Sequence, residues 1–314
     1  MKIAFTSCFD VIRDESQVAW LAMAKRQPDH VVLLGDNIYM DYAWGHKYGL
    51  RKPGKLSLAE FASTMHSYFA KQWAVPSFQV AIAAPAVHAI WDDHDFAWDN
   101  SRGGEYVFDD DRYVPPEYRR VSRLLFEQYR QALVDKPESY PANPCPTGEV
   151  SQDLGGIQTH LDLRSDLRLH LLDGRSFREV PGPISSLLGK SQREALGLAL
   201  LPAPAINLIA SGTTLSDWRL FRPDHLWLKS QCDEFNILVL SGDIHEPVLN
   251  LEKLPYEATA SAMAQPQGML ENFSKRSEVF GLVEVSAEDV RVDIFHQGQT
   301  VLSGTLARAT WTPR

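Results

Sequence analysis

Cysteine is scarce in this sequence, and long apolar runs are absent from it. Among 314 residues there are three cysteines, Cys8, Cys145 and Cys232, which are far apart and not in Cys-x-x-Cys spacing. This pattern argues against a disulfide framework and favours a reducing cytoplasm. No apolar stretch approaches the roughly 18 residues of a membrane span, and the short apolar part of the N-terminal MKIAFTSCFD does not fit a secretory signal peptide. We therefore expect a cytoplasmic protein that is not inserted in a membrane.

Positive charge is in deficit. The chain has 31 Lys and Arg against 40 Asp and Glu, which gives a formal net charge of -9 at pH 7. General binding of nucleic acid or of anionic membranes requires a basic surface, so neither partner is expected. A small phosphate ester that metal ions and a few arginines hold locally is compatible with this balance. The sequence carries no signal for an oligomeric state.

Internal repeats and low-complexity tracts are also absent, and helix-type and strand-type patterns alternate along the chain. We predict strands over residues 2–6, 30–34, 86–91, 205–210 and 236–241. We predict helices over residues 14–27, 56–73, 115–133, 191–201 and 222–232, a hairpin over 156–173, short strands over 279–307, and loops over 42–56, 99–114 and 136–150. Helices between strands imply a mostly parallel sheet, hence an α/β protein, and we interpret residues 1–314 as one domain.

The stretch WDDHDFAWDN, residues 91–100, contains four aspartates directly after an apolar predicted strand. Carboxylates this close together repel one another unless a positive charge neutralises them. Cations are the usual partners of such clusters. The stretch therefore predicts a metal site at the end of a core strand.

Four further turns that follow predicted strands carry the same kinds of residue. They contain Cys8; Asp36, Tyr39 and Asp41; Asp173, Arg175 and Arg178; and Asp243 and His245. In open α/β sheets, binding sites form outside the carboxyl ends of the strands, where such turns converge. A carboxylate that bridges two cations about 3.5–4 Å apart can build a two-metal hydrolase, and guanidinium groups bind phosphate oxygens bidentately. The five turns together predict a metal site with phosphate-binding arginines.

Other residues of the same types are interpreted as structural. His88 lies inside a predicted strand, which favours a core position over a ligand position. The further residues in this class are Cys145, Cys232, His160 and His170, while Arg51, Lys52 and Lys55 are interpreted as a solvated loop.

The segments GDNIYMD, WDDHD, LLDGRSFR and LSGDIH occur in this order, with Ser7-Cys8 before them and His245 at the end of the last. They resemble the signature blocks of the PhoD-like alkaline phosphatases (alkaline phosphatase D) of the metallophosphoesterase superfamily. The resemblance implies a four-layer α/β/β/α sandwich with a polynuclear metal centre that hydrolyses phosphate mono- or diesters. It implies iron(III) together with calcium as cofactors, with manganese, zinc or magnesium as alternatives.

The resemblance also implies roles for individual residues. Cys8, Asp36, Tyr39 and His245 would surround the iron, Asp36 would bridge to a second ion shared with Asp243 and with Asp99 or Asn100, and Asp173 would bind a further calcium. Arg175 would hold the phosphate, with Asn100 as a second phosphate contact. The family's asparagine follows the tryptophan of its WDDH block by seven or eight residues, whereas Asn100 is nine residues after Trp91. We favour Asn100 over Asp99 as the ligand, because an amide oxygen adds no charge to an acidic centre.

The expected reaction is in-line attack on phosphorus by a hydroxide that the metal ions activate. Arg175, with Arg178, would stabilise charge on the equatorial oxygens, and His94 or a neighbour of His245 would protonate the leaving group. Two other functions fit the same residues. One is a nucleotide or sugar-phosphate phosphodiesterase that uses manganese or zinc on this fold, and the other is a catalytically weak, metal-stabilised phosphate-binding protein.

Overall fold

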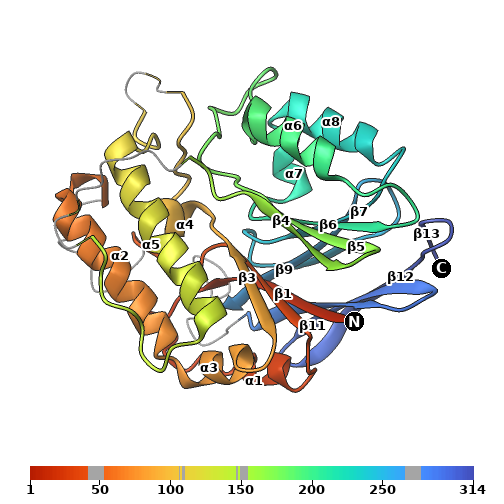
Figure 1. The fold of residues 1–314 in the computed structure, drawn as a ribbon, viewed down its shortest axis with the longest axis horizontal. Helices are drawn as coiled ribbons and strands as arrows, with labels where there is room; N and C mark the ends of the chain where they lie inside the picture. Colours follow the sequence, from red (N-terminus) through yellow and green to blue (C-terminus); the bar gives the residue numbers. More distant parts are fainter. Residues whose placement is uncertain (42–52, 106, 108–109, 146–147, 149–154, 266–276) are drawn as a thin grey trace.

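The computed structural model describes residues 1–41, 53–105, 107, 110–145, 148, 155–265 and 277–314. Strands form the centre of the molecule, and helices cover them on two sides (Figure 1). None of the helices in this described part of the chain is both long and apolar enough to cross a membrane.

One array of strands runs in the order β3, β2, β1, β10, β11, β12 and β13. Its members are β1 (Lys2–Phe9), β2 (His30–Leu34), β3 (Ala86–Ile90), β10 (Val279–Val285), β11 (Asp289–His296), β12 (Gln299–Ala307) and β13 (Thr312–Pro313). The strands β1, β2 and β3 are parallel, whereas β10 to β13 form an antiparallel meander that begins beside β1. The carboxyl ends of β1, β2 and β3 therefore lie at the same edge.

The second array has parallel strands at its centre. It consists of β4 (Thr159–Arg164), β5 (Leu167–Leu171), β6 (Ile206–Ser211), β7 (Asn236–Ser241), β8 (Pro247–Asn250) and β9 (Tyr256–Ala264). The strands β5, β6, β7 and β9 pair in parallel, and β4 and β8 are antiparallel to their neighbours. The two arrays join where the end of β1 pairs in parallel with β9, with Ser7 opposite Ser261.

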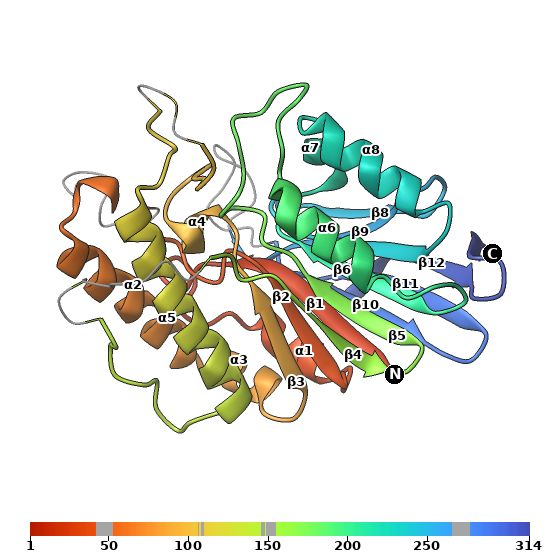
Figure 2. The ribbon, with the colours of Figure 1, turned by 45° about the horizontal axis from the view of Figure 1, so that its top comes forward.

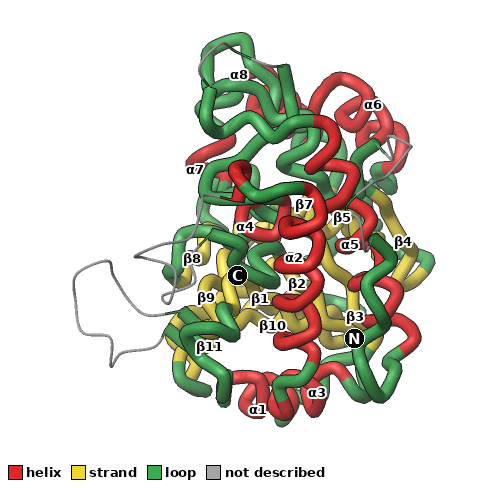
Figure 3. Tube along the Cα trace, turned by 90° about the vertical axis from the view of Figure 1, so that its left-hand side faces the viewer, coloured by secondary structure: helices red, strands yellow, loops and turns green. Residues whose placement is uncertain are grey.

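The helices lie on both outer sides of the strands (Figure 2). On the side of β1 to β3 are α1 (Ala19–Ala24), α2 (Leu58–Trp73), α3 (Pro76–Ile82) and α5 (Pro116–Asp135), with a 3-10 turn at Pro53–Lys55. On the other side are α6 (Gly189–Ala199), α7 (Leu215–Trp218) and α8 (Arg222–Gln231), and the short α4 (Asp93–Phe96) follows β3. Seen from the side of α2, the strands lie behind that helix (Figure 3).

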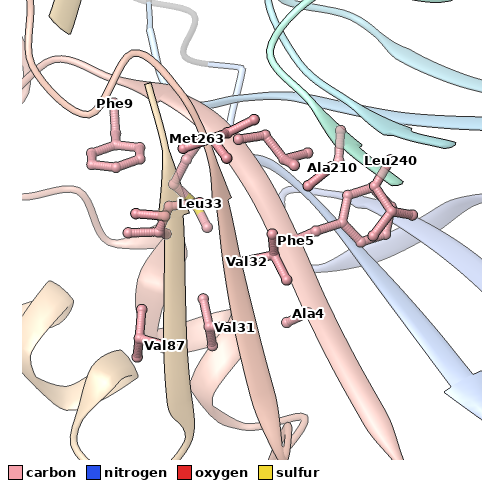
Figure 4. Close-up of a cluster of buried hydrophobic side chains, with 14 of the residues drawn as sticks. Ala4, Phe5, Phe9, Val31, Val32, Leu33, Val87, Ala210, Leu240 and Met263 are labelled. Atoms are coloured by element: carbon pink, nitrogen blue, oxygen red, sulfur yellow. The ribbon is translucent and has the colours of Figure 1, made fainter. Parts of the chain in front are cut away.

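Apolar side chains from both arrays meet between the sheets (Figure 4). Phe5 and Val32 from the first array and Ala210 and Leu240 from the second belong to one buried cluster. Complete burial of a side chain of this size contributes about 1.5–3 kcal/mol relative to exposure. This core fixes the strand ends that carry the polar turns.

The α/β class and the layered arrangement of helices and sheets confirm the prediction from sequence. The first strand is longer than predicted, because β1 continues to Phe9 and so includes Ser7 and Cys8. The first helix is shorter than predicted, because Asp14 accepts hydrogen bonds from the backbone N–H groups of Ser16 and Gln17, which favours a turn over a helix at this point.

The strand β9 was not predicted. Its sequence YEATASAMA is rich in alanine, a weak strand former, and all nine of its residues are buried. A strand buried on both faces has no alternation of polar and apolar residues. The usual sequence signal is therefore missing from the strand that joins the two sheets.

Candidate metal centre

Polar side chains from several turns meet at the carboxyl ends of the parallel strands. Asp36 follows β2, Asp93 and His94 follow β3, and Asp243 follows β7. Among the described residues, two groups have ligand atoms within 4.8 Å of one another: Asp36, Asp93 and His94, and Asp92, Asp93 and Asp243. Asp93 belongs to both groups and links them.

Five of the residues predicted to form the site have a left-handed backbone conformation, which residues other than glycine rarely adopt. The φ angles are 58° at Cys8, 53° at Asp36, 57° at Asn100, 75° at Asp243 and 55° at His245. Strained conformations of this kind cost on the order of 1–3 kcal/mol each and concentrate at functional sites, where the surrounding structure holds them. Six other non-glycine residues in the described part of the chain share this conformation, so it accompanies the site turns without being confined to them.

Two glycines allow neighbouring strand ends to approach Asp92 closely. A Cβ atom at Gly35, where φ is 98°, would lie 2.5 Å from the Cβ atom of Asp92, and one at Gly212 would lie 2.6 Å from its Oδ1 atom. Neither distance is sterically allowed. Glycine at both positions therefore lets the turns after β2, β3 and β6 pack against one carboxylate.

On one side of the cluster, sulfur, phenol and imidazole groups surround Asp36. Its Oδ2 atom lies 3.3 Å from the sulfur of Cys8 and accepts a hydrogen bond from the hydroxyl of Tyr39 at 3.2 Å. The same hydroxyl lies 3.5 Å from Nε2 of His245. The structure thus brings the four residues predicted around the iron into one cluster.

Burial shifts the protonation of these four groups. It raises the pKa of the Cys8 thiol to about 11 and raises the pKa of the Tyr39 hydroxyl well above its usual range. The pKa of the Asp36 carboxyl is also raised well above its usual range, by burial and then by the negative charge of its neighbours. Burial and the charge of His94 lower the pKa of His245 to about 4, so its imidazole is neutral at pH 7. A neutral imidazole is the form that binds a metal. The positive charge of a bound cation would favour the deprotonated forms of Cys8, Tyr39 and Asp36.

Arg175 lies between two aspartates on the other side of the cluster. Its Nε donates to Oδ1 of Asp92 at 2.6 Å, and its Nη2 is 3.4 Å from Oδ1 of Asp93. Two carboxylate oxygens, Oδ2 of Asp92 and Oδ1 of Asp93, are buried and accept no hydrogen bond from the described residues. Buried carboxylate oxygens that accept no hydrogen bond are costly. Oδ1 of Asp93 has the guanidinium of Arg175 as an ion-pair partner, and a metal cation would satisfy Oδ2 of Asp92. The donor set therefore fits metal ions.

Asp92 and Asp93 had no assigned role in the interpretation from sequence. The charge density of WDDHD predicted cations nearby, but the spacing did not identify which aspartates would face them. Asp95, two residues further on, turns away from the cluster, because its carboxylate accepts hydrogen bonds from the backbone N–H groups of Asn37 at 3.0 Å and Asp92 at 2.5 Å.

Asp41 and His94 form a second feature that the sequence did not reveal. Nδ1 of His94 lies 2.6 Å from Oδ1 of Asp41, and its ring packs against that of Tyr39 with 4.3 Å between the centroids. Burial by itself lowers the pKa of His94, but the carboxylates of Asp93, Asp36 and Asp41 together raise it well above its usual range. A protonated His94 is therefore available as a proton donor beside the cluster.

Asp99 and Asn100 are both exposed, and neither belongs to the two groups of ligand atoms. The backbone N–H of Asp99 donates to Asp41 at 2.6 Å, and that of Asn100 donates to Oδ2 of Asp93 at 2.5 Å. The side-chain amide of Asn100 donates to Asp99 at 3.0 Å. The backbone N–H groups of these two residues thus bind the carboxylates of Asp41 and Asp93. The positions of the two side chains do not decide whether Asp99 or Asn100 is the ligand.

We expect Asn100→Ala to lower the number of metal ions per chain and Asp99→Ala to leave it unchanged. The reason is that an amide oxygen can coordinate a cation without adding repulsion between carboxylates. Metal analysis of the purified variants measures this difference. Asn100→Gly is the control, because it removes the amide while tolerating the left-handed backbone. Equal metal content in all variants and the unaltered protein would show that neither side chain is a ligand.

Asp173 is fully buried, and hydrogen-bond donors occupy both of its carboxylate oxygens. Its Oδ1 accepts from the indole of Trp91 at 2.9 Å and from the backbone N–H groups of Arg175 and Ser176 at 3.0 and 2.8 Å. Its Oδ2 accepts from the backbone of Ile157 at 2.9 Å. These contacts give no support to a role as a calcium ligand. They indicate instead that Asp173 anchors the turn that carries Arg175.

Asp173→Ala should destabilise the protein and leave its metal content unchanged. Hydrogen bonds to a charged group contribute about 1.5–3 kcal/mol each, and the substitution leaves four donors without their acceptor, so we expect a loss of at least about 3 kcal/mol in the free energy of unfolding. Denaturant titration and metal analysis of the same sample test both parts. A variant of normal stability that has lost one ion per chain would restore the calcium-ligand interpretation.

Arg178 is buried beside the cluster but does not touch its carboxylates. Its Nη1 donates to the hydroxyl of Thr213 at 3.0 Å, and its guanidinium lies 4.9 Å from the ring centroid of Phe221. Burial and the charge of Arg175 lower its pKa to about 10, so it stays charged at neutral pH. Arg178 thus adds a second positive charge next to Arg175.

The residues interpreted as structural lie in neither group of ligand atoms. His88 lies 3.1 Å from His30 on the adjacent strand, and all three cysteines are buried and free. Ring contact joins His160 to His170 across β4 and β5, and Lys55 ends the 3-10 turn, while Arg51 and Lys52 fall outside the described residues.

Comparison with known proteins agrees with the fold and identifies a family. The sequence profile of the PhoD-like phosphatases matches residues 3–220, which is more than half of the chain. The chain therefore belongs to the PhoD-like phosphatase family and is a phosphoric ester hydrolase. Comparison with curated proteins found no match.

Two solved structures share the fold. One, described as the structure of PhoD, has a TM-score of 0.68 and 18% sequence identity, with 100% of this chain and 71% of that chain covered. The other is a dimetal phosphatase from Danio rerio, with a TM-score of 0.58, 12% identity, and 98% and 99% of the two chains covered. The metallophosphoesterase fold predicted from sequence is thereby confirmed.

Proposed function

We propose that the cluster at the strand ends is a polynuclear metal centre that hydrolyses small phosphate esters. The observation that carries this proposal is the position of Asp93 in both groups of ligand atoms, together with the buried carboxylate oxygens that accept no hydrogen bond from the described residues. A carboxylate shared by two groups suits a pair of neighbouring ions. We take residues 1–314 as one catalytic unit.

The two sides of the cluster suit different ions. Cys8, Tyr39 and His245 offer a thiolate, a phenolate and an imidazole, which favour iron(III) over calcium. Asp92 and Asp243 offer carboxylate oxygens, which suit calcium and equally suit manganese or magnesium. Iron(III) beside Cys8 and calcium beside Asp243 are thus our proposed cofactors.

Tyr39→Phe should remove the colour of the iron-loaded protein. A phenolate bound to iron(III) absorbs visible light by charge transfer, and phenylalanine has no oxygen to bind the metal. The absorption spectrum of the purified protein measures this directly, with Tyr129→Phe as the control because Tyr129 is equally buried on α5, away from the cluster. A colour that survives in Tyr39→Phe would exclude the phenolate as a ligand.

When bound, the metal ions would supply Lewis acidity and a nucleophilic oxygen at neutral pH. The chain's own residues would then orient the ester. Arg175, held by Asp92, would present its remaining guanidinium N–H groups to the phosphoryl oxygens, and Arg178 would add charge beside it. In this proposal His94 is a proton donor and not a metal ligand, so Asp36 and Asp93 alone of its group would bind the ion. Asp41 orients the ring of His94 through Nδ1, which leaves Nε2 to deliver a proton to the leaving oxygen.

Arg175→Lys should reduce kcat/KM about ten- to hundred-fold and weaken inhibition by inorganic phosphate. Lysine keeps the charge but loses the planar fork, and one charge-assisted contact is worth about 1.5–3 kcal/mol. Steady-state kinetics measure the effect. Arg168→Lys is the matched control, because Arg168 lies on β5 and pairs with Asp162 away from the cluster. If inorganic phosphate inhibits Arg175→Lys as strongly as the unaltered protein, Arg175 does not bind the phosphate.

Hydrolysis of a nitrophenyl phosphate monoester and of the corresponding diester tests the proposal and its alternatives. The assay compares metal-stripped protein with protein given iron and calcium, manganese or zinc. Turnover that depends on added metal supports the proposed centre, and the ratio of the two rates shows whether the phosphodiesterase alternative holds. Phosphate binding without turnover under every condition would favour the metal-stabilised binding protein.

A further inference from the structure

Ser261 connects two of the candidate ligands through one side chain. It lies on β9, opposite Ser7 at the junction of the two sheets, and it is fully buried. Its hydroxyl donates a hydrogen bond to the sulfur of Cys8 at 3.2 Å and accepts one from the backbone N–H of His245 at 3.2 Å. A hydroxyl has one donor hydrogen and two acceptor lone pairs, so both bonds form at the same time.

The two partners come from different parts of the fold. Cys8 is in β1, whereas His245 follows β7, and both have the left-handed backbone described above. The bond to the His245 N–H fixes the turn that carries its imidazole. The bond to Cys8 places a proton donor on the sulfur.

We propose that Ser261 is a positioning residue for the metal centre, which fixes the turn of His245 and withdraws charge from the sulfur of Cys8. This inference rests on the proposed function, because it takes Cys8 and His245 as metal ligands. Groups that hydrogen-bond to a metal ligand set its orientation and its donor strength, and their loss typically lowers metal affinity 10- to 100-fold. Hydrogen bonds to a ligand sulfur also change the electronic properties of the bound metal.

Cobalt(II) is the probe that tests this role. Cobalt(II) bound to a thiolate gives a charge-transfer band in the near ultraviolet, whose energy falls when the sulfur becomes richer in electrons. In the metal-stripped full chain reloaded with cobalt(II), Ser261→Ala should shift this band to lower energy and weaken cobalt(II) binding at least about tenfold in a chelator competition. Ser261→Thr keeps the hydroxyl and should restore both properties.

The controls separate this role from a loss of stability. Ser122→Ala also removes the hydroxyl of a fully buried serine, but that hydroxyl donates to the backbone of Tyr118 on α5, so the band and the affinity should not change. Ser261→Gly is a second hydroxyl-free variant for the case that Ser261→Ala does not fold. Circular dichroism of each variant checks the fold.

Two results would contradict the inference, and they are distinguishable. If Ser261→Ala keeps the band and the affinity while Cys8→Ala loses the band, Ser261 has no role but the proposed metal centre stands. If the unaltered protein shows no thiolate band and Cys8→Ala binds cobalt(II) equally well, Cys8 is not a ligand. The second result overturns the proposed ligand set and, with it, the role of Ser261.

Discussion

Replacement of Asp93 by alanine should remove bound metal and phosphatase activity together. Asp93 is the residue common to both groups of ligand atoms, so its loss deprives two ions of a ligand at once. The ions contribute several kcal/mol of charge stabilisation in such reactions, which corresponds to at least about a hundred- to thousand-fold loss in kcat/KM. Metal analysis and steady-state kinetics on the same preparation measure both effects.

A buried aspartate elsewhere in the chain is the control for this prediction. Asp224 on α8 is fully buried and accepts hydrogen bonds from Ser186, Leu187 and Leu188. Asp224→Asn should therefore lower stability without changing the metal content per folded chain. Full activity and full metal content in Asp93→Ala would show that the cluster is not the catalytic centre. We expect Asp36→Ala to lose metal and activity as well, because Asp36 belongs to one of the two groups and contacts Cys8 and Tyr39.

Removal of metal with a chelator should lower the melting temperature by about 4 °C or more. Ions that bind the folded chain at about a hundred times their dissociation constant contribute about 2.7 kcal/mol, and each kcal/mol shifts Tm by roughly 2–4 °C in proteins somewhat smaller than this one. Calorimetry with and without the chelator measures the shift. Asp93→Ala, which should hold no metal, should show little further change. An unchanged Tm in the unaltered protein would contradict a structural contribution of the ions.

The size of the chelator effect should depend on pH. Burial and the negative charges of Asp92 and Asp93 raise the pKa of Asp243 to about 7 in the metal-free fold, from an ordinary value of 3.8. A carboxyl with a raised folded pKa favours the folded state below its unfolded pKa, and this contribution is lost as the pH rises through the folded value. The metal-free protein should therefore lose stability between about pH 4 and pH 7. The shift in Tm on chelation should be larger at pH 8 than at pH 5, and the reverse order would contradict the pKa argument.

The sequence was sufficient to predict which polar turns gather at one edge of the strands, because parallel strands end there and the turns follow those ends. Asp36, Asp243 and His245 were predicted in this way, and the structure places them at this edge. The pairing of Asp41 with His94 was missed, because it joins turns after two different strands and depends on their spacing in three dimensions. The calcium role of Asp173 came from the family resemblance alone, and the sequence does not show the four hydrogen-bond donors that surround its carboxylate.

The same limit explains why Ser261 was not considered. It lies on β9, an alanine-rich strand whose complete burial removes the alternating pattern by which strands are recognised. Ser261 matters because it contacts both Cys8 and His245. Cys8 is far from both other residues in the sequence, so the sequence does not show that the three meet. The role of this serine is visible only in the folded structure, where β9 pairs with β1.

The most direct test of the central claim is a metal titration of phosphatase activity. Metal-stripped protein and its Asp93→Asn variant are assayed on nitrophenyl phosphate while iron and calcium are added back. We expect no turnover without metal, recovery in proportion to the ions bound by the unaltered chain, and no recovery in Asp93→Asn. Full turnover by the stripped protein in the presence of excess chelator, or equal recovery in the variant, would contradict a metal centre built on Asp93.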